Sequence, residues 1–172
     1  MLVLGGSLAG VSAALRVAEL GGRACLIEKG NVGQAGFHRR NTLFMDSRVP
    51  ILSSVSWDEY KTVLHSETEE YCRSMRAKLD AVGVSVVEGE GSLAGPAEIS
   101  VQKKDGENSL LKGKSVILAW GSNARFPATL PHEDGVVISI EEVAQLSALP
   151  DNVLVIGGGA FASEAALGLR KR

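Results

Sequence analysis

The stretch LVLGGSLAGVSAALRVAELGGRACLIEKG, residues 2–30, decides the fold. It begins with the apolar run LVL, passes through a glycine-rich turn into a helical pattern, and ends in a second apolar run, ACLIE. Strand, turn, helix and strand in this order predict a βαβ unit with parallel strands. The pair Gly21-Gly22 predicts the end of the helix, because glycine adopts the left-handed backbone that closes helices.

The turn GGSLAG, residues 5–10, is typical of a loop that binds the pyrophosphate of a dinucleotide. Gly5 suits the tight turn and Gly10 the close packing of helix on strand, while Ser7 stands where the middle glycine usually lies. Ser7 adds bulk beside the expected phosphates, but it also adds a hydroxyl donor. The N–H groups that open the helix attract an anion. Glu28 ends the second strand, where a carboxylate can accept both hydroxyls of an adenosine ribose, so the unit predicts nucleotide binding.

A long helix is expected after a less regular segment. Residues 30–55 show no sustained periodicity and predict a loop with a possible short helix. The helix is expected to begin at Ser56, because SWDE forms a capping box with Glu59, and to end at Gly83.

The next segments predict strands that alternate with turns. VSVVEGEGSL, residues 84–93, predicts one strand with a glycine-rich exit. Residues 97–118 predict a small antiparallel excursion with a turn at Asp105-Gly106 that leads back to the main sheet. A strand is expected to end in the turn of ILAWGSNARFP, and SIEEVAQLSALP predicts a short helix closed by Pro150.

A second glycine loop lies in VLVIGGGAFASEAALGLRKR, residues 153–172. Gly157 and Gly159 fill the first two places of the dinucleotide pattern, Ala162 fills the third, and Glu164 follows shortly after. The apolar run VLVI and the helical pattern around the loop predict the start of a second nucleotide-binding unit. Its ribose-contacting residue is expected about 20 positions past the loop, beyond the last residue of the sequence.

Two such units in one chain resemble the two-dinucleotide-fold flavoproteins, specifically the pyridine nucleotide-disulfide oxidoreductase family around dihydrolipoamide dehydrogenase and glutathione reductase. The resemblance covers essentially all 172 residues. It rests on residues 2–30, on VILAWGSNARFP, and on SIEEVAQLSALPDNVLVIGGGAFASE. It implies an α/β fold in which a Rossmann-like FAD-binding domain with a β-meander excursion precedes the start of a second, NAD(P)-binding Rossmann unit.

The resemblance also implies domain boundaries and cofactors. Residues 1–148 are expected to be the first segment of the FAD-binding domain, with the β excursion at about 92–113. Residues 149–172 are expected to begin a truncated NAD(P)H-binding domain, so that the chain would be the N-terminal portion of a longer flavoprotein. FAD and NAD(P)H are the implied cofactors, and full-length family members are homodimers.

The family roles transfer to this sequence position by position. Trp120 stands where the family has a threonine, and its indole could stack on a ring or only fill space. The implied FAD contacts are Gly5, Gly6, Ser7 and Gly10 at the pyrophosphate, Glu28 and Lys29 at the adenosine ribose, Glu90 and Gly91 at the adenine, and Ala119, Trp120, Gly121 and Ser122 in the turn near the flavin. The implied NAD(P)H contacts are Gly157, Gly159 and Ala162 at the pyrophosphate and Glu164 toward the nicotinamide.

The redox disulfide of the family is missing from its expected place after the first βαβ unit. The best register puts Gly36 and Asn41 where the two cysteines should stand, and Cys25 and Cys72 lie in a predicted strand and in the long helix. Without a thiol pair beside the flavin, dithiol–disulfide exchange cannot follow hydride transfer. The sequence therefore predicts an FAD-dependent oxidoreductase that passes hydride from NAD(P)H to a non-disulfide acceptor, not a disulfide reductase.

Two alternatives stay open beside this prediction. The first is a non-catalytic or degenerate nucleotide-binding module, or an inactive fragment. The second concerns His38-Arg39-Arg40, which could attract an anionic acceptor or could be a solvated basic loop. No catalytic residue is assigned, and neither His65 nor His132 has a neighbour that indicates catalysis or metal binding.

Composition excludes several classes of partner. The net charge of −2 lacks the basic excess that nucleic acid or an anionic membrane surface would require. No apolar run is long enough to span a bilayer, and the N-terminus lacks a signal-peptide pattern. The sequence therefore predicts a cytoplasmic or otherwise reducing location and a small-molecule electron acceptor.

Overall fold

The computed structural model describes residues 1–35, 55–130, 133 and 135–170, with only the backbone of Ala144, Glu164, Gly168 and Arg170. The chain divides into two compact units, of which the first comprises Met1–Phe37 and Thr68–Ser122. The second comprises His38–Glu67 and Asn123–Arg172. This division follows contacts between residues, and the domain boundary expected near residue 148 stays a prediction.

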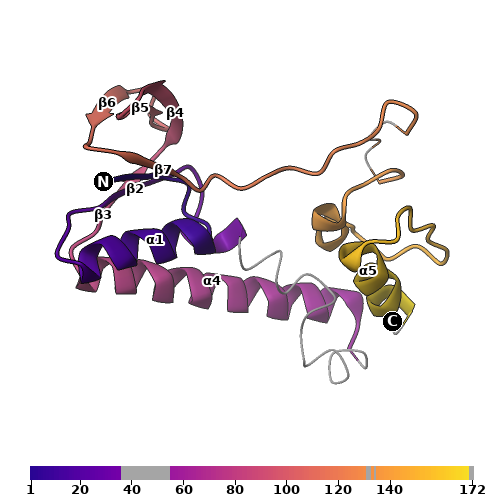
Figure 1. Ribbon diagram of the computed structural model, residues 1–172. Helices are drawn as coiled ribbons and strands as arrows, with labels where there is room; N and C mark the ends of the chain where they lie inside the picture. The colour runs from indigo at the N-terminus through magenta and orange to yellow at the C-terminus, as the bar shows by residue number, and fades with distance from the viewer. Residues whose placement is uncertain (36–54, 131–132, 134, 171–172) are drawn as a thin grey trace. The chain divides into compact units, whose positions relative to one another are not determined.

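A four-stranded parallel sheet organises the first unit (Figure 1). Its strands, in spatial order, are β3 (Ser85–Glu88), β2 (Cys25–Glu28), β1 (Leu2–Leu4) and β7 (Val116–Leu118). Helix α1 (Leu8–Glu19) connects β1 to β2, so the predicted βαβ unit and Rossmann-like α/β fold are confirmed. β1 lies between β2 and β7, which brings the first strand of the sequence next to a strand from its later part.

The end of α1 confirms the role expected of the two glycines. Gly21 has a φ of +76° and donates its N–H to the Ala18 carbonyl oxygen. Gly22 donates to the Val17 carbonyl oxygen at 2.9 Å. This pair of bonds is the Schellman arrangement, which satisfies helix carbonyls that have no partner within the helix.

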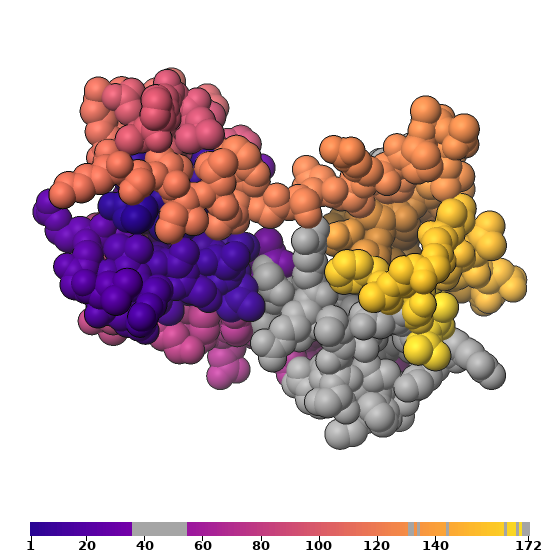
Figure 2. Space-filling view, viewed as in Figure 1, coloured from indigo at the N-terminus to yellow at the C-terminus, as the bar shows by residue number. Residues whose placement is uncertain are grey.

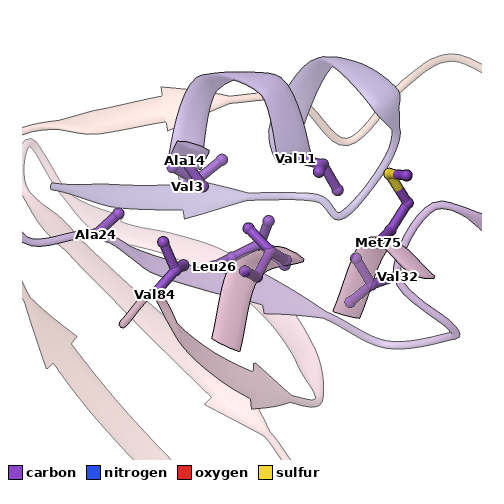
Figure 3. Close-up of a cluster of buried hydrophobic side chains, with 9 residues drawn as sticks. Val3, Val11, Ala14, Ala24, Leu26, Val32, Met75 and Val84 are labelled. Carbon is purple, nitrogen blue, oxygen red and sulfur yellow. The ribbon is translucent and has the colours of Figure 1, made fainter. Parts of the chain in front are cut away.

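The helical layer covers one face of the parallel sheet. Val3 and Leu26 point from adjacent strands into a cluster with α1 and α4 (Trp57–Ala81), and both are fully buried (Figure 3). Leu79 of α4 is also fully buried there. Because alternate residues of a strand face opposite sides, the neighbours Leu4 and Ile27 face the other side of the sheet.

A three-stranded antiparallel sheet covers that other face. It consists of β4 (Glu90–Gly95), β5 (Glu98–Gln102) and β6 (Asn108–Lys112), in that order. Ile99 and Val101 of β5 are fully buried against Leu4 and Ile27. The predicted antiparallel excursion is confirmed, including its turn at Gly106, which has a φ of +87°.

The strand predicted within residues 84–93 is confirmed as β3, but its predicted glycine-rich exit continues into a second strand. Those residues form two strands, β3 and β4, that belong to different sheets and meet at Gly89. A Cβ at Gly89 would lie 2.6 Å from Val101 Cγ1, so the backbone passes between the sheets where a side chain has no room. Val86 and Val87 of β3 are only partly buried, and most residues of β4 are exposed.

The long helix α4 has the expected start and stop. Ser56 donates its N–H to Glu59 Oε2 at 2.8 Å, and Glu59 returns its N–H to Ser56 Oγ at 3.3 Å. This is the predicted capping box. Gly83, with a φ of +72°, follows the helix as expected. Most of the loop predicted over residues 30–55 lies outside the described residues.

The second unit is less regular than the sequence predicts. Residues Ile140–Gln145 form the 3-10 helix η1, which ends before Pro150, and α5 spans Ala160–Arg170. Trp57 Nε1 donates to the Leu146 carbonyl oxygen at 2.9 Å, which satisfies a polar group where η1 stops. The strand predicted for VLVI is not formed: Leu154 and Ile156 are 85% and 64% exposed, and a strand requires a neighbour to bond with.

Candidate dinucleotide-binding site

The GGSLAG loop lies at the carboxyl edge of the parallel sheet. Gly5 donates its N–H to the Ile27 carbonyl oxygen of β2 at 2.9 Å, and Ala119 donates to the Leu4 carbonyl oxygen at 2.7 Å. The loop is therefore held between the ends of β2 and β7. Ligands of open α/β sheets bind in the crevice outside this edge of the strands.

Positions 5 and 10 leave no room for a side chain, so both must be glycine. A Cβ at Gly10 would overlap the Gly5 carbonyl oxygen, and a Cβ at Gly5 would overlap the Ala119 carbonyl group. Gly5 also has a φ of +104°, which side chains disfavour. The predicted reasons for these two glycines, a tight turn and close helix packing, agree with this geometry.

The N–H and the carbonyl oxygen of Gly6 both make hydrogen bonds within the protein. Its N–H donates to Glu28 Oε2 at 2.5 Å, and its carbonyl oxygen accepts the N–H of Gly33 at 2.6 Å. Glu28 Oε1 accepts the N–H of Gly30 at 2.8 Å. The carboxylate that was expected to meet a ribose therefore also braces the loop, and each of its oxygens keeps a second lone pair for a hydroxyl donor.

Gly33 is a site residue that the sequence reasoning missed. Its φ is +88°, and a Cβ there would lie 3.0 Å from Tyr71 Cε1 and 3.2 Å from Met75 Cγ. The glycine lets the segment after β2 pass close to α4 and reach Gly6. The available signal was a glycine in NVGQ shortly after the acidic end of β2, which fits a close backbone approach.

Ser7 occupies the N-cap position of α1 without capping it. Its backbone is extended, with φ −65° and ψ 175°, and its side chain makes no hydrogen bond to the helix. Ser7 Oγ donates instead to the Ala119 carbonyl oxygen at 3.1 Å. The next residues, Leu8 and Ala9, are exposed, and Figure 2 shows α1 (indigo) at the surface beside the orange segment around β7.

The residues predicted to contact the adenosine group differ in their surroundings. Lys29 Nζ lies 3.3 Å from Glu90 Oε1, and both side chains are largely exposed. Gly91 instead packs inward, because a Cβ there would lie 3.1 Å from Ile27 Cγ2 and 3.3 Å from Ile99 Cγ2. Lys29 and Glu90 thus flank the edge beside Glu28, while Gly91 has a packing role between the sheets.

The turn after β7 places its residues beside the loop. The Ala119 carbonyl oxygen accepts a hydrogen bond from Ser7 Oγ of the glycine loop. Trp120 is 60% exposed. Gly121 has a φ of +81° with open space around it, and Ser122 is exposed. A large exposed indole therefore follows β7 beside the glycine loop.

The second glycine loop belongs to the second unit. Gly157 has a φ of +122°, and a Cβ there would lie 3.7 Å from the Ala162 Cβ. Around Gly159 nothing lies close enough to crowd a Cβ. The side chain of Glu164 lies outside the described residues. The loop therefore precedes a helix, as predicted, but without the strand that would fix its position on a sheet.

Neither cysteine is an activated thiol. Burial raises the pKa of the Cys72 thiol, and the Glu69 carboxylate raises it further. Burial also raises the pKa of the Cys25 thiol, against a smaller lowering by the N-terminal ammonium. Both cysteines are free. Since the thiolate is the reactive form, both sites disfavour thiol chemistry.

The described residues contain no metal centre and no membrane span. In residues 1–35, 55–130, 133 and 135–170, no group of three or more His, Cys, Asp or Glu side chains could hold a metal ion. No helix in those ranges is long and apolar enough to cross a bilayer. His38-Arg39-Arg40, Gly36, Asn41 and His132 lie outside the described residues, and His65 lies in α4.

The family model of pyridine nucleotide-disulphide oxidoreductases matches residues 1–172, the whole chain. The chain belongs to this family. The predicted resemblance is thereby confirmed, and members of the family bind FAD and use NAD(P)H. The family is one of oxidoreductases.

Curated relatives of this chain include leghemoglobin reductases and dihydrolipoyl dehydrogenases. A leghemoglobin reductase of Glycine max is 31% identical over 180 residues, which covers 92% of this chain and 34% of that protein. A dihydrolipoyl dehydrogenase of Bacillus subtilis is 25% identical over 189 residues, which covers 95% of this chain and 40% of that protein. The chain thus spans about a third of the length of the curated relatives it matches.

Solved structures confirm the family fold. The HOCl-induced flavoprotein disulfide reductase RclA from Escherichia coli superposes with a TM-score of 0.78 at 16% identity, covering 99% of this chain and 39% of that chain. LpdA from Mycobacterium tuberculosis superposes with a TM-score of 0.64 at 23% identity, covering 87% of this chain and 38% of that chain. At these identities the likeness establishes the fold alone.

Proposed function

We propose that the first unit binds FAD, and that the protein carries hydride from NAD(P)H through the flavin to an acceptor other than a disulfide. The observation that carries the FAD assignment is the glycine loop between β2 and β7. There the N–H groups that open α1 are not capped by Ser7, while Glu28 lies beside the loop. When bound, FAD supplies the hydride acceptor that no side chain provides.

The residues of the first unit fit the adenosine diphosphate portion of FAD. The absence of side chains at Gly5 and Gly10 lets the loop approach the helix closely, and the first turn of α1 contains no acidic residue that would repel a phosphate. Glu28 is fixed by two N–H donors, so its carboxylate is pre-oriented toward ribose hydroxyls. Lys29 and Glu90 would border the ribose and adenine.

The proposed acceptor class rests on the cysteines of this chain. The similar solved structure of RclA is described as a flavoprotein disulfide reductase, which favours a disulfide acceptor for that protein. This chain contains only Cys25 and Cys72, and both thiols have a raised pKa. A quinone, oxygen or another small electrophile would require no thiol pair, so these acceptor classes fit the residues present.

The domain assignment completes this proposal. Residues 1–148 would form the first segment of the FAD-binding domain, and residues 149–172 would begin the NAD(P)H-binding domain, with Gly157, Gly159 and Ala162 at its pyrophosphate. One observation favours the alternative function of an FAD-binding module without turnover. The apolar run before Gly157 joins no sheet in the described part of the chain, so no strand there fixes the position of the second loop.

The visible spectrum of the purified chain tests the proposal. After incubation with FAD and desalting, we expect the absorption bands of bound flavin. In a full-length form with a whole NAD(P)H-binding domain, we expect NADH or NADPH to bleach these bands in the absence of oxygen. A quinone should then restore the bands, whereas oxidised lipoamide should not. Bleached flavin that lipoamide restores would contradict the proposed acceptor class; bound flavin that neither nicotinamide bleaches would favour the module; and loss of flavin from the folded chain would contradict both functions.

The cysteines give a separate prediction. Because both thiols have raised pKa values, we expect their reaction with Ellman's reagent at mildly alkaline pH to be slower in the folded chain than in denaturant, on the order of tenfold. The stability that neutral thiols contribute should be present below the pKa of the unfolded thiols and fall as pH rises through the folded values. Equal rates in both states would show that the thiols are accessible and ordinary.

A further inference from the structure

Ser7 departs from the family glycine, and the structure gives its hydroxyl a definite partner. Serine is among the most effective N-cap residues, because its oxygen normally accepts an N–H from the first turn of its helix. Here Ser7 has the extended backbone of an N-cap but makes no cap bond. Its Oγ donates to the Ala119 carbonyl oxygen, 112 residues away in the sequence.

This bond has two consequences for the loop. It fixes the β1–α1 turn to the residue that follows β7, and Ala119 is itself fixed by its N–H bond to Leu4. It also turns the hydroxyl away from the opening turn of α1. Because both polar groups of the Gly6 peptide are already bonded, the N–H groups of that turn are the donors that an anion at the loop would use.

We propose that Ser7 is a positioning residue for the FAD pyrophosphate, an inference that rests on the proposed function. Its bond to Ala119 holds the loop against the end of β7 and keeps the cap open, so the first-turn N–H groups of α1 stay available to the phosphates. A glycine at this position would let the backbone approach the phosphates closely. Ser7 instead positions the loop through its hydrogen bond to Ala119.

Three variants at one position separate positioning from folding. In Ser7→Asp, the carboxylate can cap α1 and interact favourably with the helix dipole, so we expect the melting temperature of the FAD-free chain to be kept or raised. The same carboxylate would occupy the N–H donors and repel the phosphates. FAD affinity should then fall by about tenfold or more.

The other two variants test the hydrogen bond to Ala119. Ser7→Ala removes the bond to Ala119, and we expect FAD affinity to fall about fivefold. Ser7→Thr keeps a hydroxyl at the same position and should bind FAD nearly as tightly as the unchanged chain. Adenosine, which has no phosphate, should bind all four forms with similar affinity.

Each FAD-free protein is titrated with FAD while flavin fluorescence is measured. A thermal melt of each protein is recorded without ligand. Weakened FAD binding in Ser7→Asp with a preserved melting temperature would support the inference. Equal FAD affinity in the unchanged chain, Ser7→Ala and Ser7→Asp would overturn it, as would a loss of affinity that only follows a loss of stability. Failure of the unchanged chain to bind FAD would instead contradict the proposed function.

Discussion

Gly10→Ala is expected to abolish retention of FAD and to lower the free energy of unfolding by about 3 kcal/mol, as overpacking of a rigid site does. The added Cβ would overlap the Gly5 carbonyl oxygen and would lie 3.3 Å from the Ala119 Cβ. The Gly5 carbonyl oxygen belongs to the backbone, so it cannot rotate away from the added methyl group as a flexible side chain could. The loop would therefore have to move off α1, and the positions of its N–H groups would change.

Gly159→Ala is the matched control for this variant. It introduces the same methyl group into the glycine loop of the second unit, where no atom lies close enough to crowd it. We expect it to leave the melting temperature and FAD retention nearly unchanged. Thermal melts and flavin absorbance after desalting measure both variants, and a Gly10→Ala chain that melts and binds like the control would refute the packing argument.

Glu28→Gln is expected to weaken FAD binding by about ten- to a hundredfold, the range for loss of hydrogen bonds to a charged group. The carboxylate accepts the N–H groups of Gly6 and Gly30, one on each oxygen. A glutamine has only one acceptor oxygen, so its NH₂ group would face one of these donors. The loop would lose a brace, and the ribose would lose an acceptor.

Glu19→Gln removes a carboxylate from the same βαβ unit and serves as the control. Glu19 pairs with Arg16 on the exposed surface of α1, 3.0 Å away, where such pairs contribute little. We expect its FAD affinity to match that of the unchanged chain in a fluorescence titration. Equal affinities for Glu28→Gln and Glu19→Gln would show that Glu28 does not contact the nucleotide.

The site could be predicted wherever a role depends on neighbours in the sequence. The spacing of Gly5 and Gly10, followed by a helical pattern and an acidic strand end, indicated the loop and Glu28 without coordinates. Gly33 could not be assigned in this way, because its bond to Gly6 forms only when the segment after β2 folds back over α4. Gly91 was assigned to a ligand, although its lack of a side chain is required by packing between the sheets.

The sequence by itself determined the βαβ unit, the capping box at Ser56 and the helix end at Gly21, because each depends on hydrogen bonds and periodicity within a few residues. Only the tertiary structure decided that the Ser7 hydroxyl bonds to Ala119, that residues 84–93 divide between two sheets, and that VLVI forms no strand. These features depend on which distant residues come into contact, and a local pattern carries no information about its partners. A strand needs a neighbouring strand and a hydroxyl donor needs an acceptor, and only folding brings these partners together.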